Sequence, residues 1–385
     1  MSRIVAVLLS FILFFVLVGQ SAAAGQVNVF IYHRFDESRY PSTNISADIF
    51  RQQLNYLKEN QYQVLSLGEV VRRLIAAEPL PEKAVALCID DAFTSFVEVG
   101  MPLLREFGYP VSLFINTDAV ATHGYLDWAQ IKALHDEGVE IGNHTATHAY
   151  LVEKEPGEEM SAWHERVVAD IIKAQQRFEK HLGAAPSLFV YPYGEYSSEV
   201  VDIVKQIGFT AAFAQQSGVI HSGHDLFTLP RFPMGGAYAT LEGFVNKLKM
   251  KPLVVSEEEP FSAVVINNPP ELLLDIDTAD VDMRRVNCFV QGENSCQIEA
   301  VSGRDGWYRV IAEQPLSSRR NKYTLTVPGK KGGWHWYSHL WINAKLPALE
   351  TKMEAVQKEA VRDEKSAADA KVDGSEALEP VGADQ

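Results

Sequence analysis

The chain has 385 residues, a formal net charge of −15 at pH 7 and an isoelectric point of about 5.2. This acidic balance argues against a nucleic-acid partner and favours a neutral or cationic substrate. The length is sufficient for about two domains with a sizeable core.

Residues 1–24 are typical of a secretory signal peptide. Arg3 precedes an apolar run over residues 4–18, and small residues follow at 21–24. We expect cleavage after Ala24 and a mature protein that is secreted or periplasmic. The alternative is an uncleaved membrane anchor, but the apolar run is a little short to span a bilayer. We therefore expect no stable membrane span after cleavage.

Residues 25–251 alternate between strand-like and helix-like segments. This repeated order predicts an α/β fold with a largely parallel sheet, closed or nearly closed into a barrel, and reactive residues at the carboxyl ends of its strands. The predicted elements are strand 29–32, helices 47–60 and 67–77, strand 84–89, helix 97–107, strand 111–115, helix 127–137, strand 139–141, helix 165–182, strand 188–191, helix 198–207 and strand 209–213.

Two adjacent carboxylates, Asp90 and Asp91, follow the apolar strand at 84–89. At the end of a parallel strand, both side chains can turn into a cleft. Neighbouring carboxylates repel each other unless a cation or a shared proton stabilises them. One of the two can therefore bind a metal while the other acts as a base. The alternative interpretation is an ordinary polar strand-to-loop turn.

His144 and His148 lie four positions apart in a chain with 11 histidines. On a helical turn this spacing places both imidazoles on one face, where they can share one ion. The spacing alone is a weak signal. Together with the carboxylate pair, it predicts a His, His, Asp set for a divalent metal that leaves a position open for water or substrate.

Three motifs occur in an order that resembles the NodB-homology polysaccharide deacetylases, carbohydrate esterase family 4. They are Ile89-Asp90-Asp91, His144-Thr145-Ala146-Thr147-His148 and Tyr191-Pro192-Tyr193-Gly194. Residues 30–35, 50–57 and 63–67 resemble the form of this family found among exopolysaccharide N-deacetylases. The similarity covers roughly residues 27–250 and implies a distorted (β/α) barrel.

The resemblance also implies roles for individual residues. The expected metal ligands are Asp91, His144 and His148, with zinc as the expected ion or another divalent metal such as Co²⁺, Ni²⁺ or Mn²⁺. Asp90 would be the general base that activates the attacking water. The backbone N–H of Tyr193 would stabilise the oxyanion, and Pro192 would fix the turn that presents it.

Two positions depart from the family pattern. Val190 stands where the family has an arginine that pairs with the catalytic aspartate, and Arg231 is the candidate to replace it. An ordinary surface arginine is the alternative for Arg231. The Leu-x-His motif that supplies the general acid has no clear counterpart, so His221 is the candidate acid, with a solvent-exposed loop around His221 and His224 as the alternative.

Two further residues are candidates for substrate binding together with Pro192. His33 is expected to line the cleft, or else to be a buried, hydrogen-bonded histidine. Trp128 is expected to stack on a sugar ring, or else to belong to the core at the start of a helix.

Residues 252–345 change to short strands separated by Gly, Pro and Asn turns, which predicts a small Ig-like all-β sandwich. The predicted strands are 263–266, 271–276, 286–290, 296–300, 307–311, 322–327 and 334–342. We expect the aromatic residues of the last strand to pack half into the core and half against the barrel, with a sugar-stacking platform as the alternative. Residues 346–385 are predicted to be a disordered charged tail, with a transient helix over 349–365.

The three cysteines are expected to differ in state. Cys288 and Cys296 are close enough to bridge a hairpin in an oxidising compartment. Cys88 lies inside the predicted buried strand and is expected to be a small apolar filler.

The sequence therefore favours an exported, metal-dependent polysaccharide N-deacetylase. We expect an acetylated polysaccharide as its substrate and a monomeric chain. An O-acetyl esterase on a similar scaffold is the alternative enzyme. A carbohydrate-binding protein that keeps the metal without turnover is the alternative from another class, but such a protein has no chemical need for both Asp90 and Asp91.

Overall fold

The computed structural model describes residues 25–290 and 293–346. The predicted signal peptide and the predicted tail beyond residue 346 therefore lie outside the described residues. Within the described part of the chain, no helix is long and apolar enough to cross a membrane.

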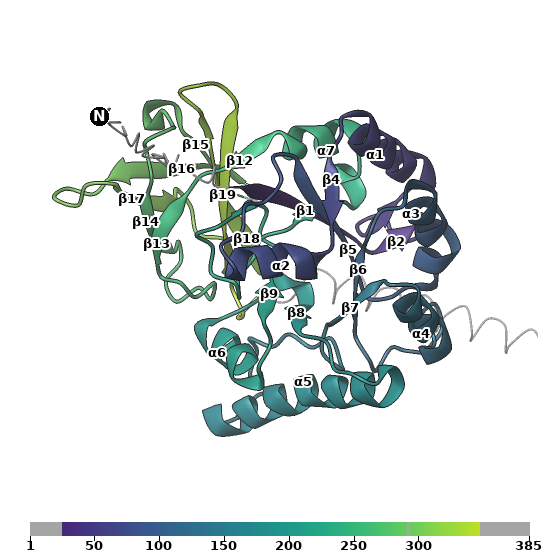
Figure 1. Ribbon diagram of the computed structural model, residues 1–385. Coiled ribbons are helices and arrows are strands. Elements are labelled where there is room, and N and C mark those ends of the chain that lie inside the picture. The colour runs from purple at the N-terminus through teal and green to yellow at the C-terminus, as the bar shows by residue number, and fades with distance from the viewer. Residues whose placement is uncertain (1–24, 291–292, 347–385) are drawn as a thin grey trace, which may run out of the picture.

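A curved, largely parallel sheet forms the centre of the first 250 residues (Figure 1). Its strands follow the order β10-β1-β5-β6-β7-β8-β9, with β11 also paired to β1 and β4 also paired to β5. All of these pairs are parallel except β1 with β10. The bounds are β1 (Gln26–Tyr32), β4 (Gln63–Leu65), β5 (Ala84–Asp90), β6 (Ser112–Ile115), β7 (Glu140–Asn143), β8 (Leu188–Val190), β9 (Ala211–Phe213), β10 (Val219–His221) and β11 (Phe232–Pro233), while the short β2 (Arg34–Phe35) and β3 (Asn44–Ile45) pair with each other.

Among the described residues, no continuous order of strands closes the sheet, so only the closed form of the expected barrel is corrected. β9 and β10 stand at the two ends of the strand order, and no strand pairing joins them within residues 25–290 and 293–346. The segment after β9 connects the two sides of the sheet, because Leu229 bridges Phe213 of β9 and the following strand β11 pairs with β1. The sheet is therefore curled, and this irregular segment spans its gap.

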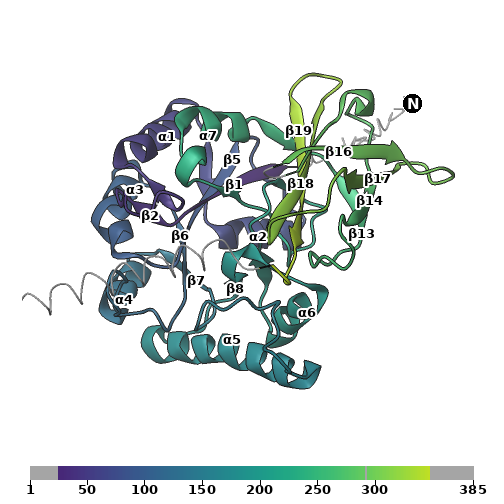
Figure 2. The ribbon, with the colours of Figure 1, turned by 180° about the vertical axis from the view of Figure 1, so that it is seen from behind.

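Helices surround this sheet (Figure 2). Most begin at a Ser, Thr or Asp whose side chain accepts a backbone N–H of the first turn, and α3, α5 and α6 end at a left-handed glycine. The bounds are α1 (Ala47–Glu59), α2 (Leu67–Ile75), α3 (Met101–Phe107), α4 (Trp128–Asp136), α5 (Met160–Leu182), α6 (Ser198–Ile207) and α7 (Leu241–Leu248). A π-helical turn, Phe96–Gly100, precedes α3.

The strand β5 is buried along its whole length, as its apolar sequence predicts. Side chains alternate between two core clusters. Val85, Leu87 and Ile89 belong to one cluster, whereas Ala86 and Cys88 belong to the other. This alternation places the next residue of the strand, the carboxylate at position 90, on the same side as Cys88.

Residues 250–346, here called the β-region, form an eight-stranded sheet in the order β12-β19-β18-β15-β16-β17-β14-β13. Its strands enclose a separate apolar cluster that includes Leu272, Val310 and Leu325. The all-β character agrees with the sequence, while the Ig-like assignment stays a prediction. The bounds are β12 (Met250–Pro252), β13 (Val255–Glu259), β14 (Glu271–Ile276), β15 (Asn287–Val290), β16 (Glu293–Ala300), β17 (Trp307–Ala312), β18 (Arg320–Pro328) and β19 (Trp334–Ile342).

Details of the β-region test several expectations. A disulfide joins Cys288 to Cys296 across the β15–β16 hairpin, as predicted. In β19, Trp341 packs in the cluster of the β-region and Trp336 packs against the first domain, which agrees with the predicted division of the aromatics. The predicted strand at 263–266 is wrong, because that segment makes only an isolated bridge at Val264.

Candidate active site

A cleft of about 310 Å³ opens at the carboxyl ends of the parallel strands. Each of β1, β5, β6, β7, β8 and β9 is followed within a few residues by a side chain that lines it. This is the edge where parallel sheets gather functional groups, because the loops that follow every strand meet there. These residues are His33, Asp90, Asp91, Asn116, His144, Tyr193 and Gln215.

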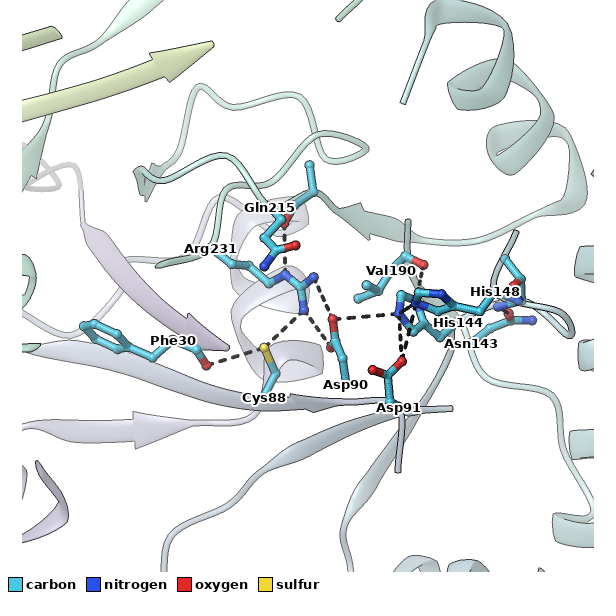
Figure 3. A network of polar contacts seen from close by, with 12 residues as sticks. Phe30, Cys88, Asp90, Asp91, Asn143, His144, His148, Val190, Gln215 and Arg231 are labelled. Carbon is cyan, nitrogen blue, oxygen red and sulfur yellow. Dashed lines mark hydrogen bonds and ion pairs between the residues drawn. The ribbon is translucent and has the colours of Figure 1, made fainter. Parts of the chain in front are cut away.

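Asp90 ends β5 and is held by Arg231, as shown in Figure 3. Nη1 and Nη2 of the guanidinium donate to the two carboxylate oxygens at 2.9 and 3.1 Å, while Nε donates to the Ala214 carbonyl at 3.0 Å. Both side chains are buried. Burial acts to raise the pKa of Asp90, but the charges of Arg231 and the neighbouring imidazoles outweigh it, so the pKa is lowered. Asp90 is thus an ionised carboxylate in a buried site.

Cys88 also contacts this pair, since Arg231 Nη1 lies 3.4 Å from its sulfur. The thiol is buried, and burial raises its pKa to about 12. Cys88 is therefore a neutral core residue, as the sequence predicts.

Asp91 converges with two histidines on the other side of the cleft. Its Oδ1 lies 3.6 Å from His144 Nε2 and 3.4 Å from His148 Nε2, and the two Nε2 atoms are 3.0 Å apart. One ligand atom from each of the three residues lies within 4.8 Å of the others. His144 Nδ1–H donates to the Val190 carbonyl at 2.8 Å, which leaves its Nε2 to face the carboxylate. The donor set of two imidazoles and one carboxylate fits a divalent ion such as zinc.

Burial favours the neutral form of His144. Desolvation, with a contribution from His148, lowers the pKa of its imidazole to about 3. A neutral imidazole is the form that binds metals. The network of Asp90, Asp91 and both histidines is drawn in Figure 3.

The two histidines are brought together by a loop, which corrects the expectation of a helical turn. Residues 144–148 follow β7 without helical structure. Thr145 and His148 have φ angles of 67° and 58°, and Asp91 has a φ of 75°. Positive φ is uncommon outside glycine and most unfavourable for the β-branched Thr145, so the surrounding structure stabilises this backbone.

Tyr193 stands in a second turn of this kind, with φ 59° and ψ 4° inside the short 3-10 segment Pro192–Gly194. Its ring packs edge-on against His148, with ring centroids 4.5 Å apart. Gly194 also has a positive φ of 68°, and a Cβ there would lie 2.2 Å from the Cβ of Gln215. The turn is therefore both strained and tightly packed at the edge of the cleft.

Comparisons with known proteins agree with this geometry. Residues 77–212 match the family model described as polysaccharide deacetylase.

The chain carries a polysaccharide deacetylase domain. Residues 25–249, which contain the matched segment, are here called the deacetylase domain.

The deacetylase domain has relatives of stated activity. The chain is 24% identical over 300 residues to the poly-β-1,6-N-acetyl-D-glucosamine N-deacetylase of Escherichia coli K12, a match that covers 69% of this chain and 43% of the relative. The chain thus spans less than half the length of that protein. It is 21% identical over 214 residues to the Staphylococcus aureus (strain MRSA252) protein of the same name, covering 54% of this chain and 73% of the relative.

Solved structures share the fold of the deacetylase domain. The Streptococcus pyogenes deacetylase PplD in complex with acetate superimposes with a TM-score of 0.52 at 20% identity, covering 58% of this chain and 99% of that one. A de-N-acetylase from Aggregatibacter actinomycetemcomitans gives a TM-score of 0.51 at 24% identity, covering 57% and 99%. The curled sheet is therefore that of the NodB-type deacetylase fold.

Other candidate residues of the deacetylase domain fall inside or beside the cleft. His33 lines it. Burial lowers the pKa of His33, and the Asp91 and Asp90 carboxylates act in the opposite direction. Pro192 is buried behind Tyr193 and is absent from the residues that line the cleft.

The structure does not bring His221 to the active site, so its predicted role as the general acid is wrong. His221 pairs with Gln26 at the start of β1, whereas Tyr32 at the end of that strand pairs with Ile89 beside Asp90. At about 3.3 Å per residue, this separation along the sheet is roughly 20 Å. His221 instead lines a different cavity, of about 350 Å³, between the deacetylase domain and the β-region.

Trp128 does not line the cleft either. It is the first residue of α4, and its ring stacks on His181 of α5 with centroids 4.3 Å apart and an interplanar angle of 5°. Phe178 of the same helix meets it edge-on. The expectation of sugar stacking is corrected to a helix–helix contact, the core role that the sequence also allowed.

Sequence reasoning missed several residues that line the cleft, and one of them comes from the β-region. Arg320, at the start of β18 in the β-region, is among the lining residues. Its guanidinium donates to the side chain and the backbone carbonyl of Gln215 at 3.3 and 3.1 Å. The two adjacent arginines at 319 and 320 were a visible signal, since they stand just before the predicted strand at 322–327.

Proposed function

We propose that this chain is an exported, metal-dependent N-deacetylase that acts on polymers of N-acetylhexosamine, with poly-β-1,6-N-acetylglucosamine as the model substrate. One observation carries the proposal: a buried, ionised Asp90 stands beside a convergent Asp91, His144, His148 set in a single cleft. The Escherichia coli and Staphylococcus aureus relatives named as deacetylases of this polymer support the choice of substrate.

Asp91, His144 and His148 would hold the metal, and zinc is the ion that their two nitrogens and one oxygen suit best. A bound divalent ion would polarise the acetamide carbonyl and lower the pKa of water. The Val190 carbonyl fixes the tautomer of His144, so that this ligand is already oriented.

The chain's own residues would carry the protons. Asp90 would accept a proton from the attacking water, and Arg231 keeps Asp90 ionised and aligned for this step. The backbone N–H of Tyr193 would donate to the developing oxyanion. The proton that Asp90 accepts would then pass to the leaving amine, and His33 would contact the substrate in the same cleft.

Export is part of the proposal. Residues 1–24 have the composition of a signal peptide. The Cys288–Cys296 disulfide supports an oxidising compartment for the folded protein.

The test is acetate release from N-acetylglucosamine oligomers and polymers by the purified chain, with added zinc and with chelator. Asp90→Asn and Asp91→Asn form a matched pair, because each removes one negative charge from the same strand end. Asp90→Asn should lose turnover and still bind zinc, whereas Asp91→Asn should lose zinc binding as well.

The outcomes separate the candidate functions. Release of acetate from O-acetylated glycans alone would favour the esterase. Zinc binding with no release from any N- or O-acetylated glycan would refute the enzyme and leave a carbohydrate-binding protein. Turnover that survives in chelator and in Asp90→Asn would contradict both the metal and the base.

A further inference from the structure

Two consecutive arginines of the β-region, Arg319 and Arg320, reach across to the deacetylase domain. We call this pair the arginine clamp. Arg319 is 5% exposed, and Arg320 lines the active-site cleft. Arg319 contacts the two loops that carry His148 and Tyr193, whereas Arg320 contacts Gln215 in the loop after β9.

Arg319 binds one carboxylate from each loop. Its Nη2 and Nε donate to Glu195 at 2.8 and 3.3 Å, and its Nη1 donates to Glu153. Glu195 follows Tyr193 by two positions, and Glu153 follows His148 by five. Glu195 and Arg319 are both buried, so removing either side chain would leave the charge of the other without a partner. A single guanidinium thus ties both loops to the β-region.

Arg319 also reaches the cleft through a stack of aromatic rings. Its Cζ lies 4.3 Å from the ring centroid of Tyr150. Tyr150 stacks on Tyr193 with centroids 3.9 Å apart and an interplanar angle of 11°, and Tyr193 meets the ring of His148 at 4.5 Å. The stack therefore runs without a gap from the β-region to a candidate metal ligand.

Arg320 supports the same turn from its other side. It donates to both the side chain and the carbonyl of Gln215. Gln215 in turn packs on the backbone of Gly194, where a Cβ would lie 2.3 Å from the Gln215 nitrogen. The turn at Tyr193 therefore lies between Glu195, which binds Arg319, and Gln215, which binds Arg320.

The contacts of Arg319 and Arg320 surround backbone that has an uncommon conformation. Tyr193 and His148 both have positive φ, at 59° and 58°. Such conformations are uncommon for residues other than glycine, and contacts with neighbouring residues stabilise them. The arginine clamp supplies those contacts from outside the deacetylase domain.

We propose that Arg319 is a positioning residue of the active site, which holds Tyr193 and His148 in their working geometry, so that the β-region is part of the catalytic unit. The proposal rests on the deacetylase function proposed above. A purely structural role would change only the stability of the protein. A positioning role predicts that removing the arginine clamp changes turnover and zinc affinity more than it changes the binding of the polymer.

The experiment compares Arg319→Gln and Arg319→Lys with the wild-type full chain. Trp336→Phe is the matched control, because it removes another contact between the β-region and the deacetylase domain, the 3.0 Å bond from the indole N–H to the Ser217 carbonyl. The measurements are kcat and KM for acetate release, zinc affinity of the metal-free protein by calorimetric titration, and the melting temperature.

We expect Arg319→Gln to lower kcat about 10- to 100-fold and to weaken zinc binding about 10-fold, with KM changed less than threefold, as for other residues that orient metal ligands. Arg319→Lys keeps the charge without the forked geometry and should fall between Arg319→Gln and wild type. Trp336→Phe should lower the melting temperature and leave kcat and zinc affinity within twofold.

Two results would overturn the proposal. One is a drop in melting temperature for Arg319→Gln and Arg319→Lys with kcat and zinc affinity within twofold of wild type. The other is an equal loss of turnover in Trp336→Phe, which would show a general effect of the interface. If wild type releases no acetate from any glycan, the deacetylase function fails, and the ratio of zinc affinities between Arg319→Gln and wild type still decides the positioning role.

Discussion

Replacing Arg231 with methionine tests whether the buried ion pair keeps Asp90 ionised. The substitution removes the guanidinium and leaves the carboxylate at 2% exposure without its bidentate partner. Removal of one member of a buried pair typically costs about 3–5 kcal/mol of folding free energy, because the remaining charge is buried and uncompensated. That is a large fraction of the total stability of a typical domain.

The cost should depend on pH with a definite sign. In the wild type, the folded-state pKa of Asp90 is lowered, so its ionisation stabilises the fold above the unfolded-state pKa, and this stabilisation is lost as the pH falls through the folded-state pKa. Without Arg231, burial acts to raise the pKa of Asp90, and ionisation then opposes folding as the pH rises. The difference between wild type and Arg231→Met should therefore be larger at pH 7 than at pH 4.

The assay is urea unfolding of the metal-free proteins in chelator at these two pH values. Arg105→Met is the matched control, because Arg105 also binds a carboxylate with two bonds, to Glu137 at 2.6 Å each, but both side chains are largely exposed. Surface pairs of this kind contribute about 0–1 kcal/mol. The acid limb of acetate release should also move to higher pH in Arg231→Met. A loss no larger than that of Arg105→Met, or one equal at both pH values, would refute the reasoning.

Three further outcomes are expected. Gly194→Ala should lower the free energy of unfolding by about 3 kcal/mol or more and abolish turnover, because its φ of +68° and a contact at 2.2 Å both oppose a Cβ. The control Gly183→Ala has a φ of +85° and open space around the Cβ, so it should cost only about 1–2 kcal/mol in urea unfolding. Equal losses of unfolding free energy in the two variants would contradict this. Replacing Cys288 by serine breaks the bond to Cys296, eight residues away, and should cost about 2–3 kcal/mol by thermal unfolding; a melting temperature unchanged by the substitution or by reductant would contradict it. His221→Ala should leave kcat within twofold, and a larger fall would return His221 to the mechanism.

The sequence predicted the elements whose signals are local. The apolar run that forms β5 is buried on both sides, and the Ser and Gly signals at helix ends match the observed helices. The sequence also predicted that Asp91, His144 and His148 share a site, because two strand ends of a parallel sheet meet at one edge. Elements of two or three residues, such as β10, are too short to show a period.

What the sequence did not give depends on contacts between distant segments. The spacing of His144 and His148 predicts a helical turn, but the backbone brings the two side chains together through positive φ at Thr145 and His148. No local sequence signal indicates this conformation. The position of His221 followed from the pairing of β10 with β1 rather than from its place in the chain. Arg231 is a distant contact that the sequence did predict. Because Val190 replaces the arginine of the family pattern, Arg231 was the candidate partner of Asp90, and it does bind that carboxylate.

The separation of the paired segments along the chain has a consequence for the order of assembly. The first described strand, β1, completes its pairing only when β10 and β11 are available, and Arg319 bonds across 124 and 166 residues to Glu195 and Glu153. Contacts this distant form late, because a long loop must close before they contribute. We therefore expect newly made chains to collapse around β5 first and to gain a working cleft in the last step of folding, when the β-region docks.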